Sequence, residues 1–161
     1  MSDNKAEVML VVEGESDARV LAVRPEATAA EVLEVVIREA GRTDLIEIFL
    51  EDADEPILAE MLLAELLAAN KLLHVGSKGL ISVVVEYGQK QVSRQFRPSA
   101  TMDKIVRWAI QPNELDVHAP IEDLQLKHGD DVLPGDLHLG QVTHGHKQAK
   151  FSLVFKIKPQ G

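Results

Sequence analysis

The chain has 161 residues, of which 45% are hydrophobic and only 4% aromatic, so the sequence predicts a globular protein with an aliphatic core. Its formal net charge of -9 argues against a nucleic-acid partner, and the absence of cysteine excludes disulfides, thiolate nucleophiles and cysteine-based zinc sites. No apolar stretch approaches the roughly 20 residues of a membrane span, and Met1–Glu7 lacks the apolar core of a signal peptide. We therefore expect a soluble cytoplasmic protein that binds neither a membrane nor a nucleic acid.

Charge and an internal repeat both divide the chain near its middle. Residues 1–77 contain 6 basic and 17 acidic residues, whereas residues 78–161 contain 11 and 9. Arg-Pro-Glu-Ala-Thr at 24–28 recurs as Arg-Pro-Ser-Ala-Thr at 97–101, and Val-Val-Glu at 11–13 recurs at the same offset. A shared offset indicates two copies of one unit. The expected organisation is a domain at 1–76, a short flexible linker at 77–79, a domain at 80–158 and a tail at 159–161.

Periodicity predicts the elements of the first copy in chain order. Alternating apolar residues predict two strands at 7–13 and 19–24. Thr28 is placed to cap the next helix with Glu31 at capping-box spacing, and Gly41 to end that helix in a left-handed cap. The remaining expected elements are a strand at 46–50, a short helical turn at 61–67 and a last strand at 71–75.

The second copy repeats this order. The expected elements are a hairpin of strands at 80–87 and 91–97, a helix from Thr101 that ends before Pro112, a strand at 121–127 and a final strand at 150–158. A turn at 128–131 and an irregular connector at 137–142 separate the last two strands. Trp108 lies in the helical apolar pattern and is expected in the core. Each unit thus reads β-β-α-β-β with one helix across a mixed sheet, so the predicted fold class is α+β with two tandem β-grasp domains.

The residues that begin each helix resemble those of ubiquitin. In ubiquitin an acidic-Pro-Ser-Asp-Thr segment joins the second strand to the helix, as 24–28 and 97–101 do here. The alternating final strand and the Gly-ending tail are similar as well. Two such units in tandem resemble, in architecture, the bacterial ubiquitin-like modifiers of antiphage conjugation operons (the BilA type) and the vertebrate interferon-induced two-domain modifier. The lack of cysteine and the distance from any vertebrate ubiquitin favour the bacterial group.

The resemblance implies a protein modifier that is not an enzyme and needs no cofactor of its own. It implies ubiquitin-activating-like and conjugating-like enzymes and a deconjugating metalloprotease as partners, with target proteins joined covalently to Gly161. Tail recognition would involve Lys158, Pro159 and Gln160. Gly161 has no Cβ and permits close approach to its carbonyl, while Pro159 favours an extended lead-in. Gln160 departs from the family pattern, because ubiquitin ends in two glycines. A frayed chain end is the alternative interpretation of residues 159–161.

Two rival functions remain open from the sequence: a non-covalent adaptor or scaffold, and a self-assembling interaction protein. Ubiquitin binds many partners through an apolar patch on its third and last strands. The matching outward positions of the second unit, Gln125, Lys127 and Val154, form no such patch.

Two polar segments are the other candidate sites. The histidines at 144 and 146, with His128 and His138 nearby, are expected in a solvated loop rather than around a metal. The acidic residues 51–55 are expected to form a solvated turn, with docking on a basic enzyme surface as a hypothesis. The sequence shows no Ser-His-Asp set, no glycine-rich phosphate loop and no paired catalytic carboxylates.

Overall fold

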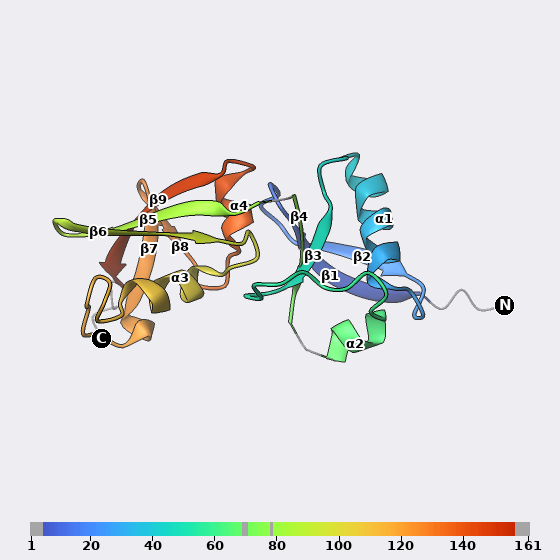
Figure 1. The fold of residues 1–161 in the computed structure, drawn as a ribbon, viewed down its shortest axis with the longest axis horizontal. Helices are drawn as coiled ribbons and strands as arrows, with labels where there is room; N and C mark the ends of the chain where they lie inside the picture. Colours follow the sequence, from blue (N-terminus) through green and yellow to red (C-terminus); the bar gives the residue numbers. More distant parts are fainter. Residues whose placement is uncertain (1–4, 69–70, 78, 157–161) are drawn as a thin grey trace, which may run out of the picture.

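The computed structural model describes residues 5–68, 71–77 and 79–156, which form two sheets with separate cores (Figure 1). The first unit has strand order β2-β1-β4-β3. Its elements are β1 (Ala6–Val12), β2 (Arg19–Val23), α1 (Ala29–Ala40), β3 (Glu47–Leu50), α2 (Leu63–Ala68) and β4 (Leu73–Gly76).

The second unit has strand order β6-β5-β9-β7-β8. Its elements are β5 (Ile81–Tyr87), β6 (Lys90–Phe96), α3 (Met102–Ala109), the 3-10 turn η1 (Ile121–Asp123), β7 (Leu124–His128), β8 (Asp131–Leu133), α4 (Leu139–Thr143) and β9 (Gln148–Phe155). No described helix has the length and apolar composition needed to cross a bilayer.

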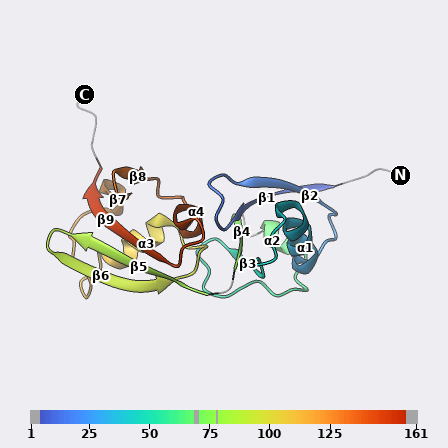
Figure 2. The same ribbon diagram turned by 90° about the horizontal axis from the view of Figure 1, so that it is seen from above.

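Each unit is a β-grasp domain. Its first and last strands run parallel at the centre of the sheet, where Leu10 is opposite Leu73 in the first unit and Val85 is opposite Phe151 in the second. The flanking strands are antiparallel to these, and one long helix packs across the sheet (Figure 2). The predicted fold class, α+β with two tandem β-grasp domains, is confirmed.

The repeated Thr caps both long helices, as the sequence predicts. The hydroxyl oxygens of Thr28 and Thr101 accept the backbone N–H groups of Glu31 and Lys104, at 3.3 and 3.2 Å. Gly41 ends α1 with a left-handed φ of 65°. The reciprocal half of the expected capping box is absent from the described contacts of Glu31, whose carboxylate pairs instead with the Arg24 guanidinium at 2.8 Å.

The two cores belong to different units: the first is aliphatic, and the second is aliphatic apart from Phe96, Trp108 and Phe151. Trp108 is buried in the second core, where its ring meets Phe96 edge to face at 5.4 Å. The expected core position of Trp108 is therefore confirmed. Since each unit has its own core, each sheet is stabilised mainly by its own helix and loops.

The second unit departs from the sequence prediction between its helix and its final strand. The strand expected at 121–127 starts at Leu124, because residues 121–123 form the 3-10 turn. The expected irregular connector contains α4, and β8 precedes it. Elements of five and three residues are too short for periodicity to reveal. The final strand, expected at 150–158, starts at Gln148 and ends at Phe155, whose side chain is 52% exposed.

Candidate functional site

The tail follows a strand that is held on both edges. β9 pairs in parallel with β5 and antiparallel with β7, and the N–H of Lys156 donates to the Asp123 carbonyl at 2.8 Å. The predicted site residues Lys158, Pro159, Gln160 and Gly161 lie outside the described residues. The strand therefore fixes the point from which the tail departs.

The outer face of the second unit matches the sequence prediction. Leu124 and Leu126 face the core, while Gln125, Lys127 and Val154 lie half-buried on the opposite side. The ion pair of Lys150 with Glu86, at 2.9 Å, is part of the same sheet. Within the described second unit, the third and last strands thus present mixed polar chemistry rather than a continuous apolar patch.

The matching face of the first unit is apolar and closed. Phe49 of β3 lies opposite His74 of β4, which lies opposite Val11 of β1. Their side chains are 1%, 0% and 1% exposed, although Val11 and Phe49 belong to neither core cluster. The second unit covers them: the Arg97 guanidinium stacks over the Phe49 ring, and Gly140 packs against the His74 ring. We call this contact between the two units the seam.

The seam contains two buried histidines. The Nδ1 atoms of His74 and His138 are 2.9 Å apart, and His138 Nε2 lies 2.7 Å from a Glu51 carboxylate oxygen. Burial, together with the neighbouring His138, lowers the pKa of His74 to about 3. His74 is therefore neutral, and one of the two Nδ1 atoms donates a hydrogen bond to the other. His74 Nε2 is buried and has no hydrogen-bond partner among the described residues.

The acidic loop is not the solvated turn that the sequence suggests. The Asp52 carboxylate accepts the Thr101 backbone N–H at 2.7 Å and its hydroxyl at 3.1 Å. Lys104 donates to the Asp52 carbonyl at 2.8 Å and to the Asp54 carboxylate at 3.1 Å. Residues 51–54 thus dock on the start of α3. The basic surface that this loop meets in the structure belongs to the second unit of the same chain.

Ser77, the first residue of the expected linker, is held by hydrogen bonds. Glu13, at the end of β1, is 1% exposed and accepts the backbone N–H and the hydroxyl of Ser77, both at 2.6 Å. Lys147 donates to the other carboxylate oxygen at 3.0 Å. The preceding Gly76 is still part of β4. The linker expected at 77–79 therefore begins with a residue that contacts both Glu13 and Lys147.

The remaining histidines form no metal centre in the described part of the chain. His144 and His146 are exposed in the loop after α4, as expected, and His128 is exposed at the end of β7. His138 is separated from them in the seam. No group of three or more His, Cys, Asp or Glu side chains within the described ranges could hold a metal ion.

Comparison with known proteins gives the class of this protein. Residues 82–156 match the family model of BilA ubiquitin-like domain 2. No curated protein matches. Similar solved structures include the Caldiarchaeum subterraneum ubiquitin, at 14% identity and a TM-score of 0.40, covering 51% of this chain and 100% of that chain. Another is the ubiquitin-like domain of an Arabidopsis thaliana protein, at 17% identity and a TM-score of 0.40, covering 52% and 85%.

The chain is thus built from two β-grasp units, and the match of its second unit points to a non-enzymatic ubiquitin-like protein. Its second unit is the part that is similar to BilA ubiquitin-like domain 2. The architectural resemblance to the vertebrate interferon-induced modifier is not supported by these comparisons.

Proposed function

We propose that this chain is a ubiquitin-like protein modifier, joined through Gly161 to target proteins in a bacterial antiphage conjugation system. The observation that carries the proposal is the match of residues 82–156 to BilA ubiquitin-like domain 2. That unit ends in β9, and only five residues separate Phe155 from Gly161. We propose the domain limits 1–76 and 80–158, with 77–79 between them and 159–161 as the tail.

The proposed chemistry uses the chain as an electrophile. An activating enzyme transfers AMP from ATP to the Gly161 carboxylate and releases pyrophosphate. An enzyme thiolate then displaces AMP to form a thioester, and a target amine displaces the thiolate to form an amide. The chain has no cysteine, so the thiolates belong to its partner enzymes. Gly161 leaves space around the reacting carbonyl, and Lys158, Pro159 and Gln160 guide the tail into the enzyme.

We expect these enzymes to recognise the second unit. The face of the first unit that corresponds to the partner-binding face of ubiquitin, with Val11, Phe49 and His74, is closed by the seam. The outer face of the second unit is accessible, and its central strand leads to the tail. The first unit is therefore proposed to act through other surfaces.

The test is a reaction of the purified chain with the activating enzyme encoded beside its gene, in the presence of ATP and magnesium. We expect an adduct that a thiol reductant cleaves and that deletion of Gly161 abolishes. The matched control is Gln89→Ala in the exposed β5–β6 turn, which leaves the adduct intact. No adduct with the unchanged chain, or an equal adduct after the deletion, would contradict the proposal. A non-covalent adaptor would instead keep its function when a C-terminal fusion blocks the carboxylate.

A further inference from the structure

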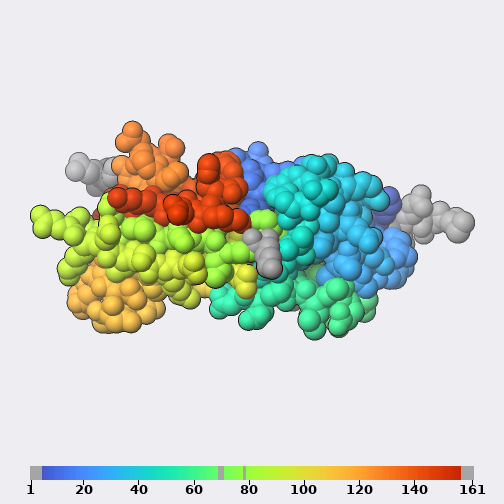
Figure 3. Space-filling view, turned by 45° about the horizontal axis from the view of Figure 1, so that its top comes forward, coloured from blue at the N-terminus to red at the C-terminus, as the bar shows by residue number. Residues whose placement is uncertain are grey.

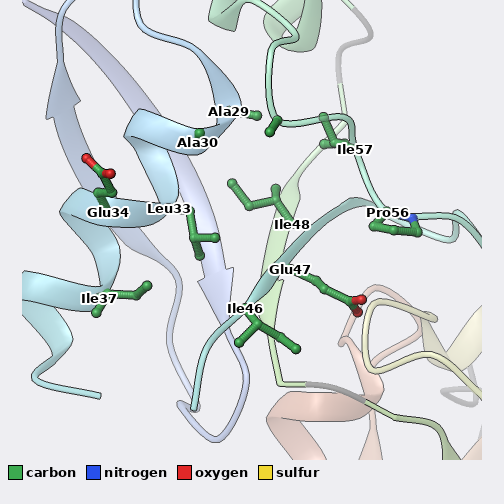
Figure 4. Close-up of a pocket in the computed structure, with 11 residues that line it drawn as sticks. Ala29, Ala30, Leu33, Glu34, Ile37, Ile46, Glu47, Ile48, Pro56 and Ile57 are labelled. Carbon is green, nitrogen blue, oxygen red and sulfur yellow. The ribbon is translucent and has the colours of Figure 1, made fainter. Parts of the chain in front are cut away.

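The first unit has an apolar groove that neither the seam nor the tail accounts for. It lies between α1 and β3 and has a volume of about 410 Å³ (Figure 4). Its apolar walls are formed by Ala30, Leu33, Ile37, Ile46, Ile48 and Ile57. Ile46 is 47% exposed, so this wall faces solvent. A groove of this size holds one or two large side chains of a ligand.

The charge around the groove selects its ligand. Glu34 and Glu47 are the only charged residues among those that line it. The first 77 residues hold 17 acidic residues and 6 basic ones, and three of these basic residues already pair with acids of their own unit. Those three are Arg19, Arg24 and Arg42. An apolar side chain flanked by lysine or arginine is the complementary ligand, because the field of this unit attracts cations.

The chain itself carries a segment of that chemistry. Residues 155–158 read Phe-Lys-Ile-Lys, which alternates apolar and basic side chains. Phe155 is 52% exposed, and Lys156 is exposed beside it. We propose that the C-terminal segment of one copy docks in the groove between α1 and β3 of a second copy. This interaction does not rest on the proposed conjugation function.

The reach of the chain makes the docking intermolecular. β9 starts beside the first unit, where Lys147 contacts Glu13, and its eight residues run away from it for about 26 Å. Figure 1 shows β9 ending at the far end of the second unit from α1. Residues 156–158 span at most about 10 Å when fully extended. The segment 155–158 therefore falls short of the groove in its own first unit. The space-filling view shows the two units side by side along the molecule (Figure 3).

The arrangement has a consequence for assembly and for the tail. A groove on one unit and a segment at the opposite end make a heterologous contact, which builds rings or open chains of copies. A tail held in the groove of a neighbour is withheld from any enzyme that acts on Gly161. Self-association and use of the tail would then compete.

The test measures binding of a fluorescent peptide of residues 155–161 to the full chain by anisotropy. We expect Ile46→Asp to lower the affinity for the peptide by about tenfold or more, because it places a charge in the apolar wall. Glu34→Lys reverses a charge at the rim and spares the apolar wall, and it should lower the affinity for the peptide as well. The matched control is Val20→Asp, since Val20 is 60% exposed on β2 and lies outside the groove.

Sedimentation of the full chain completes the test. We expect concentration-dependent association that an excess of the peptide reverses, and that a peptide with Glu in place of both lysines leaves unchanged. Equal peptide affinity for the unchanged chain and for Glu34→Lys would overturn the proposal. So would a chain that stays monomeric at every concentration. Neither assay contains ATP or an enzyme, so failure here is distinguishable from failure of the proposed function.

Discussion

At the residue scale, Gly140 shows how closely the two units approach. A Cβ added there would lie 2.9 Å from His74 Cε1 and 3.1 Å from Pro98 Cβ. Contacts below about 3 Å force neighbouring atoms apart, so the absence of a side chain permits this packing. Thr28 and Leu62 form an isolated β-bridge in the first unit, and Thr101 and His138 form one in the second. The start of α4, which contains Gly140, therefore corresponds to the start of α2 in the first unit. The seam thus depends on residues, such as Gly140, by which the second unit differs from the first at corresponding positions.

We predict that Gly140→Ala destabilises the chain by about 1–3 kcal/mol, because the new methyl group overlaps the His74 ring. Urea unfolding measures the change. A double-mutant cycle with His74→Ala supplies the control, since removal of the ring should remove most of the penalty. An equal penalty in the presence and absence of the His74 ring would show that the two residues do not pack as described.

At the element scale, α3 is capped twice, once by its own Thr101 and once by Asp52 of the first unit. A carboxylate at a helix start satisfies free N–H groups and interacts favourably with the helix dipole. Asp52 can occupy this position because it adopts a left-handed φ of 66°, which Asp tolerates better than most residues. A loop of one unit therefore completes a helix of the other.

We predict that Asp52→Ala lowers the free energy of unfolding by about 1–2 kcal/mol. It should also raise the hydrogen-exchange rate of the Thr101 amide, because that amide loses its acceptor. Hydrogen exchange followed by NMR reads this site directly. Asp130→Ala, in the exposed turn between β7 and β8, is the matched control and should leave the Thr101 amide unchanged. Unchanged exchange in Asp52→Ala would refute the capping role.

The sequence predicted elements whose signal is local. Thr28, Gly41 and Thr101 set helix ends by their own hydrogen bonds and φ angles, so the caps can be predicted from the sequence. The seam cannot be predicted from local sequence in this way. His74 lies within an apolar strand and Glu13 ends another, and each pattern has a local interpretation until the second unit is placed on the sheet. Only a charged or titratable residue inside an apolar run hints at such a contact.

At the scale of the whole molecule, the polar contacts of the seam include the buried His74–His138 pair, so the docking of the two units responds to pH. The pKa of His74 is about 3 in the folded chain, against 6.5 ordinarily. Between these values the unfolded or separated state binds more protons than the folded one. The contribution of His74 to stability is therefore fully present above pH 6.5 and is lost as the pH drops toward 3. Protonation would place a charge beside His138 in a buried site.

We predict that the unfolding free energy of the unchanged chain decreases by up to about 1.4 kcal/mol per pH unit more steeply than that of His74→Ala between pH 6 and pH 4. Urea midpoints over a pH series measure both slopes. The comparison isolates His74, because Glu13, Glu51 and every other residue of the seam are the same in both proteins. Parallel pH profiles would contradict a buried neutral His74.

The central claim, that the Gly161 carboxylate is joined to target amines, is tested most directly by mass spectrometry of conjugates formed with the partner enzymes. Trypsin cleaves after Lys156 and not at the Lys158–Pro159 bond, so it should leave Ile-Lys-Pro-Gln-Gly on the modified lysine of a target. We predict that this remnant is found with the unchanged chain and is lost when Gly161 is deleted. Its absence from every peptide formed with the unchanged chain, or its attachment through any residue other than Gly161, would contradict the account.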